Sequence, residues 1–258
     1  MKRKVSVPVV AVACTLIYAA GCSSSKPGIG TNPGVTAEPY NPKQAPVPSS
    51  ANFSNLPKAD ANVPDAQFVE LNSGYQIGAL FYALSSGSLP DYEKLSMAVS
   101  PEYRSTADTF RKRDLMQGLK PQIDQQIQAY KDKRNRYFTA KVGGYLSAGN
   151  LLVLKHYDFK TNSFPLAQDM SPNTYYSFSD TPFYSYIFTN GSGFQQFPLR
   201  DEQKAREIED LLTKSQIAQG YVTAYMFAQG ADAATHRVQM QIVRMILTGP
   251  GHTEVARH

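Results

Sequence analysis

Cysteine is scarce in this sequence, and its positions limit what the folded part can contain. The 258 residues include two cysteines, Cys14 and Cys22, and none follows residue 22. The rest of the chain therefore has no thiol for a disulfide framework, a cysteine-based zinc site or a cysteine nucleophile. Its stability must come from a packed core, and residues 65–258 are long enough to build one.

Familiar catalytic motifs are also missing. The sequence contains no G-x-S-x-G elbow, P-loop, H-E-x-x-H pair or dinucleotide fingerprint. None of the four histidines, at positions 156, 236, 252 and 258, has another histidine at i+2 or i+4. We therefore expect no metal site and no cofactor, and we favour a protein that is not an enzyme. The alternative is an envelope or cell-wall hydrolase with an unrecognised site that uses His156 and Asp158.

The positive net charge does not indicate a nucleic-acid partner. The formal charge is +5, and Lys2, Arg3 and Lys4 lie in the first 21 residues, which contain no acidic residue. Removing these three charges leaves +2, so we expect no nucleic-acid binding. The basic stretch 111–113 could meet phosphate-bearing lipids, but Asp108 and Asp114 flank it, and this pattern favours a solvated helix face.

The first 22 residues have the pattern of an export signal. Three basic residues precede an apolar run at 5–20, and the small residues 19–21 lead directly to Cys22. The run is too short and too interrupted for a transmembrane helix, which needs about 20 apolar residues. The alternative is an ordinary signal peptide, cut after Ala20 or Gly21 to release a soluble protein.

Residues 19–22, Ala-Ala-Gly-Cys, resemble the lipobox of bacterial lipoproteins, although alanine stands at 19 where leucine is commonest. The resemblance implies cleavage before Cys22 and acylation of its thiol, which binds the chain to a lipid bilayer. In such proteins Ser23 after the cysteine implies sorting to the outer membrane, with the folded part in the periplasm.

Three segments are predicted along the chain. Residues 1–21 are the signal peptide, residues 22–64 a lipidated cysteine with a disordered tether, and residues 65–258 one globular domain. Eight of the seventeen prolines fall in 23–64 among Ser, Gly, Asn and Ala, a composition that cannot bury enough apolar surface to fold. The alternative for Pro39, Pro42, Pro46 and Pro48 is a recognition segment.

The first half of the domain has helical periodicity. Apolar residues recur at helical spacing in 74–84, 91–99 and 106–134, where Pro121 should kink or split the last helix. Ser100 followed by Pro101 indicates a further helix start. Another amphipathic helix is expected at 199–213.

The second half alternates as strands do. We expect strands at 137–142, 150–159, 184–189, 222–227 and 238–247. The alternation slips by one residue near Val243, which predicts a bulge, and residues 229–235 should form a hairpin loop. The glycines at 143, 144 and 149 predict bends, and the histidines at 252 and 258 should lie in a solvated tail. The predicted fold class is α+β, with a helical N-terminal half packed on a mainly antiparallel sheet formed by the C-terminal half.

Aromatic residues are concentrated between positions 175 and 197, where nine occur in 23 residues. Such rings offer large contact areas, so they could form a partner surface. The candidate binding residues are Tyr175, Tyr176, Tyr184, Tyr186 and Phe188. The alternative, which the pattern favours, is that these rings pack the sheet.

These patterns together predict a membrane-anchored lipoprotein of the bacterial envelope that acts as a non-catalytic binding or assembly-supporting module for an envelope protein. Residues 65–258 are similar to uncharacterised Gram-negative envelope lipoproteins in a generic way, and no functional residue follows from that similarity.

Overall fold

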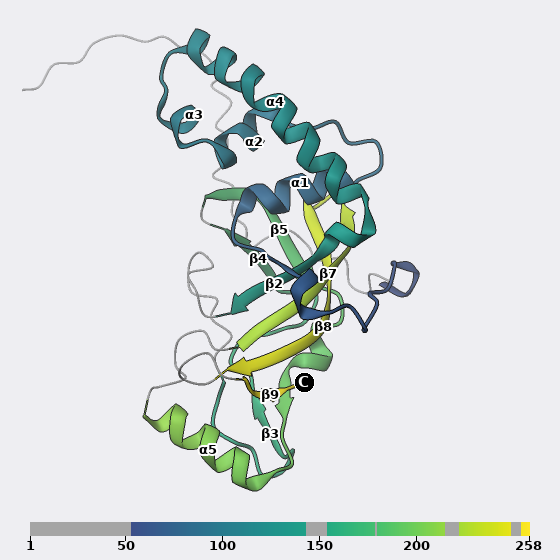
Figure 1. Ribbon diagram of the computed structural model, residues 1–258, viewed down its shortest axis with the longest axis vertical. Helices are drawn as coiled ribbons and strands as arrows, with labels where there is room; N and C mark the ends of the chain where they lie inside the picture. Colours follow the sequence, from purple (N-terminus) through teal and green to yellow (C-terminus); the bar gives the residue numbers. More distant parts are fainter. Residues whose placement is uncertain (1–52, 143–153, 179, 215–221, 249–253) are drawn as a thin grey trace, which may run out of the picture. The chain divides into compact units, whose positions relative to one another are not determined.

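The computed structural model describes residues 53–142, 154–178, 180–214, 222–248 and 254–258 (Figure 1). The helices are α1 (Gly74–Leu84), α2 (Tyr92–Val99), α3 (Pro101–Ser105), α4 (Thr109–Lys131) and α5 (Glu202–Thr213). The strands are β1 (Val69–Glu70), β2 (Tyr137–Val142), β3 (Ser163–Pro165), β4 (Tyr175–Phe178), β5 (Thr181–Phe188), β6 (Gln196–Pro198), β7 (Val222–Asp232), β8 (Arg237–Thr248) and β9 (Glu254–Arg257). Among these residues no helix is both long and apolar enough to cross a membrane.

The helices begin where polar side chains satisfy their first backbone N–H groups. Ser73 and Gln76 form a reciprocal capping box at the start of α1. Ser100 caps α3, as predicted, with Pro101 in the first helical position. Asp201 accepts two backbone N–H groups of α5. The predicted helix boundaries therefore agree with the structure to within a few residues.

Helix α4 is one uninterrupted helix of 23 residues, although Pro121 lies inside it. Of the two predicted effects of this proline, a kink or a split, the split was wrong. Pro121 has no N–H for the carbonyl of Gln117, but both residues are exposed, so solvent can satisfy that carbonyl.

The main sheet has the order β1-β2-β7-β8-β5-β4, with β9 also paired to β8. Strand β7 pairs with one side of β8 along most of its length. The other edge is shared by β5, which pairs with 237–240, and β9, which pairs with 246–248. Between them the side chain of Asn190 donates to Ile242 O and accepts from Ile242 N, both at 2.8 Å. One amide thus continues the ladder where no strand is present.

The α+β class is confirmed, but two details of the prediction were wrong. The sheet is mixed, because β1 pairs parallel to β2 and β5 pairs parallel to β8. The helices are not confined to the N-terminal half, since α5 lies between β6 and β7. Parallel neighbours need a long crossover, and α1 to α4 form the crossover from β1 to β2. The two-residue strand β1 carries no periodicity that could reveal this arrangement.

The β7–β8 hairpin confirms the predicted slip at Val243. Tyr225 pairs with Arg244 and Met226 with Ile242, so Val243 is the extra residue of a bulge. A second bulge lies at Gln229 on β7, between the pairs of Ala228 and Gly230. The hairpin loop is shorter than predicted, because β7 continues to Asp232 and β8 starts at Arg237.

Two further predictions, the strand at 150–159 and the solvated tail at His258, need correction. Of the predicted strand at 150–159, the described residues 154–159 contain only isolated bridges, at Leu154 and Asp158. His258 is not in a solvated tail, since its backbone exchanges two hydrogen bonds with Met245 and its ring lies against Phe194. The predicted bends at 143–149 and His252 lie outside the described residues.

The two faces of the main sheet have different covers. The inner face packs against α1 and continues into the core beneath α4 and beside α5. Residues from β2, β7 and β8 that point the other way form a smaller outer cluster. That cluster contains Val63, Phe68, Tyr137 and Phe227, with Ala59, Tyr225 and Val243 packed against it. Residues 53–64, within the predicted tether range, lie on this outer face through Ala59 and Val63.

Candidate binding groove between two helices

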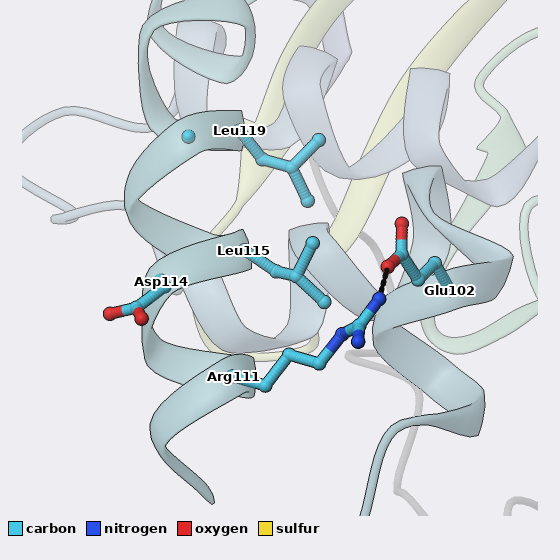
Figure 2. A pocket seen from close by; sticks show the side chains of 6 residues that line it. Glu102, Arg111, Asp114, Leu115 and Leu119 are labelled. Atoms are coloured by element: carbon cyan, nitrogen blue, oxygen red, sulfur yellow. Dashed lines mark hydrogen bonds and ion pairs between the residues drawn. The ribbon is translucent and has the colours of Figure 1, made fainter. Parts of the chain in front are cut away.

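The candidate site is a groove between the short helix α3 and the N-terminal half of α4 (Figure 2). Helix α3 is held in place by Tyr103, which is buried. Asp108 caps α4 by accepting the N–H of Arg111 at 2.9 Å. The buried Tyr103 and the Asp108 cap thus fix the two helices on either side of the turn between them.

The floor of the groove is apolar. Leu115 and Leu119 point from α4 into the space beside α3, as Figure 2 shows. Apart from its chain neighbours and the backbone of its own helix, Gly118 between them has no atom within 4 Å of the position a Cβ would take. The groove has a volume of about 400 Å³, which is enough to accept apolar side chains of another molecule.

An ion pair forms the rim of the groove. Arg111 on α4 contacts Glu102 on α3 at 2.6 Å, and this hydrogen bond raises the pKa of the Arg111 guanidinium. Both side chains are exposed, so the pair contributes little to stability. Its effect is to orient a charged edge beside an apolar floor.

The groove arises because the apolar stripe of α4 is longer than the surface that covers it. Ile123, Ile127 and Tyr130 are buried at its C-terminal half. Leu115 and Leu119 are only half-buried, and Phe110 is 71% exposed with Arg113 over its ring at 5.5 Å. The sequence predicts this stripe, but its spacing alone does not show which part is left uncovered.

The predicted aromatic binding residues lie mostly in the interior. Tyr176, Tyr184, Tyr186 and Phe188 are buried. Tyr175 is half-buried, and the Arg237 guanidinium lies over its ring at 4.8 Å. In this conformation the four buried rings offer no surface to a partner, and their placement corresponds to the packing alternative.

These buried tyrosines are held by one another. The hydroxyls of Tyr82 and Tyr184 are 2.9 Å apart, and the ring of Tyr176 stacks on Tyr186 at 5.3 Å. Burial raises the pKa of Tyr176, Tyr184 and Tyr186 well above the usual value of 10.0. The neutral phenols therefore belong to the folded state across the physiological pH range.

His156 meets a carboxylate, but not in a deep pocket of the described residues. Its Nδ1 contacts Glu209 on α5 in a short hydrogen bond, and Glu209 also accepts the N–H of Tyr157 at 3.1 Å. The imidazole is 79% exposed. Asp158 instead accepts from Lys160 and Thr161 in its own turn. Histidine and Asp158 are thus engaged with different partners.

Within the described ranges, no cluster of three or more His, Cys, Asp or Glu side chains could hold a metal ion. Cys22, the predicted lipidation residue, lies outside those ranges. Comparison with protein-family models, curated proteins and solved structures found no match to this chain.

Proposed function

We propose that this chain is a lipoprotein of the bacterial envelope, cut before Cys22 and anchored to the bilayer through lipid on that cysteine. Ser23 supports outer-membrane sorting with the domain in the periplasm. The lipoprotein anchors that this pattern resembles carry more than one acyl chain, and two chains bind a membrane stably where one does not.

The domain is a non-catalytic binding module, and the uncovered apolar stripe of α4 is the observation that carries this proposal. The apolar face of α4 is buried at Ile123 but only half-buried at Leu115, so part of its apolar surface is not covered by the rest of the domain. A groove between two helices suits an amphipathic helix of an envelope protein, which can insert apolar side chains between them. Phe110 beside the groove would extend the contact.

Site-specific photo-crosslinking in the native envelope tests the groove. A photoreactive residue at Leu115 or Leu119 is expected to capture the same protein, and Phe110→Ser should reduce the yield at least ~5-fold, because a buried aromatic anchor contributes strongly to binding. A photoreactive residue at Phe159, which is 77% exposed elsewhere, is the matched control. Equal capture of the same protein from Phe159 would contradict a specific groove.

One observation favours a second candidate function, a hydrolase acting on envelope polymers. Glu209 fixes Nδ1 of His156, which leaves the other ring nitrogen to face outward, the arrangement that general bases and metal ligands use. Release of soluble fragments from purified cell wall, compared between the native chain and His156→Ala, decides between the candidates. The binding-module proposal expects no release that depends on His156.

A further inference from the structure

Residues 53–63, which we call the strap, run beside β7 and β8 (Figure 1, dark blue), and Ala59 and Val63 pack on the outer face of the sheet. Five hydrogen bonds join them to the domain. Three carbonyl groups of the strap accept hydrogen bonds: Pro57 O from Gln229 Nε2, Lys58 O from Lys133 Nζ and Val63 O from Arg244 Nη2. Two backbone N–H groups donate: that of Ala59 to Gln241 Oε1 and that of Asp60 to Tyr137 OH. The bond from Arg244 to Val63 O is 3.2 Å long, and the other four are 2.9 Å long.

In every one of these bonds a backbone atom of the strap meets a side chain of the domain. Within the strap only Val63 is buried, and the other side chains are half-buried or exposed. Segments with few buried apolar contacts and exposed backbone hydrogen bonds open at lower free energy than the sheet beneath them. The strap has few buried apolar contacts, and its hydrogen bonds to the domain are part-buried, except the exposed bond from Lys133 to Lys58 O.

The buried amide of Gln229, under the strap, keeps hydrogen-bond partners without it. Gln229 lies in the β7 bulge and is buried, and its Oε1 accepts from Thr189 at 2.6 Å. Its Nε2 also reaches Gln241 Oε1 at 3.3 Å. Lys133 lies over the ring of Phe227 at 5.2 Å. Leaving a buried polar group without a partner is costly, and removal of the strap leaves Gln229 with partners.

The residues after the strap are held by side-chain contacts as well. Asp65 forms ion pairs with Arg244 and with Arg257, the latter at 3.2 Å. The Arg244 guanidinium lies over the rings of Phe68 and Tyr225, at 4.8 and 4.6 Å from their centroids. We call these five residues the latch. Directly beyond it, Leu71 N donates to Thr139 O at 2.8 Å and β1 pairs with β2.

We propose that the strap is a lid: tension on the tether lifts residues 53–63 as one unit, while the latch and the sheet stay folded. Lifting uncovers the outer patch of Tyr137, Phe227 and Val243. The trigger rests on the proposed function, because the anchored Cys22 supplies the fixed end of the tether. The contacts from Pro57 to Val63 all precede Asp65 in the chain, so a pull from the N-terminal side acts on the strap before it reaches the latch.

Hydrogen exchange on the whole chain from Cys22 onward, without lipid, tests opening as a unit. The amides of Ala59 and Asp60 should exchange at least ~100-fold faster than that of Leu71, because only the strap opens. Tyr137→Phe removes one strap bond and keeps the ring, so it should speed Ala59 as well as Asp60 by roughly fivefold. Tyr157→Phe, which removes a hydroxyl bond to Leu199 O, should change neither rate.

Two outcomes of this exchange experiment would contradict the proposal. If Tyr137→Phe speeds Asp60 alone, the strap does not open as a unit. If Leu71 speeds equally, opening belongs to global unfolding and the lid proposal fails.

Pulling with single-molecule force on the same chain tests the trigger. Cys22 is its only thiol, so one handle can be attached there and the other at the C-terminus. A first low-force step should release 11 residues, a contour length of roughly 36 Å, and Tyr137→Phe should lower only that step's force. A single unfolding step would overturn the proposal. This outcome is independent of lipidation in cells, which fractionation measures separately.

Discussion

The two faces of the main sheet are made by the same strands but are covered in different ways. On β2, Phe138 faces the helices and is fully buried among apolar side chains, whereas its neighbour Tyr137 faces the strap. The inner cover is held by side-chain packing. The outer cover is held by the packing of Ala59 and Val63 and by side chains of the sheet that bind the backbone of residues 57–63.

This difference shows how one sheet can have a permanent face and a removable one. Packing of large apolar side chains cannot be undone locally without opening a cavity. Hydrogen bonds to an exposed backbone can be exchanged for water at small net cost. We therefore expect substitutions on the inner face to change global stability, and substitutions on the outer face to change local opening.

The largest expected effect comes from Phe138→Ala. Removing a buried ring from the inner face should lower the free energy of unfolding by about 3–5 kcal/mol, while Tyr137→Phe next to it should cost about 1 kcal/mol or less. Urea unfolding of both variants measures this. If the two variants lost the same free energy of unfolding, the proposed difference between the two faces would be wrong.

The next effect concerns the ladder of β8. Asn190→Ala leaves both polar groups of the Ile242 backbone without their partner, which should cost about 2–3 kcal/mol. Asn135→Ala, which removes one exposed side-chain bond to Ala129 O, is the control and should cost about 0.5 kcal/mol or less. If the two variants unfold at the same urea concentration, Asn190 does not complete the sheet.

The smallest effect is the pH response of the latch. Desolvation raises the pKa of Asp65, but its hydrogen bonds and charge interactions with Arg257 and Arg244 outweigh this and lower the pKa below 3.8. A carboxyl group with a lowered folded-state pKa stabilises the fold above its unfolded pKa, and this contribution is lost as pH falls through the folded value.

The native chain should therefore be more stable than Asp65→Asn from pH 5 to 8, by less than about 1 kcal/mol because Asp65 is partly exposed and screened. The difference should begin to shrink as the pH falls to about 3.8, the ordinary pKa of this carboxyl, and should disappear once the pH is below the lowered folded-state pKa. Thermal unfolding of both proteins across this range measures it. A difference that grows as the pH falls would contradict the latch.

Local signals in the sequence were sufficient for much of the fold. The cap at Ser100 and the slip at Val243 are visible because each depends on neighbouring residues in the chain. The parallel pairings of β1 and β5 were not predictable, because pairing across a crossover depends on residues distant in sequence. Strand β9 follows Gly249 and Pro250, which indicate an end to regular structure.

The candidate sites were harder to predict for a related reason. Composition cannot reveal the strap, since the sheet binds its backbone and the backbone is the same for every non-proline residue. The groove was hidden because Leu115 and Ile123 belong to one stripe in the sequence and only the fold decides which is covered. The aromatic cluster was visible, but density alone does not separate a surface from a core.

The account depends most directly on lipid at Cys22. Mass spectrometry of the N-terminal peptide from the membrane fraction is the decisive measurement, with Cys22→Ala as the matched variant. We predict a mature chain that begins at Cys22 and carries acyl chains, and loss of processing and of membrane attachment in the variant. A mature chain cut after Ala20 or Gly21 without lipid, or a Cys22→Ala protein that remains processed and membrane-bound, would contradict the account.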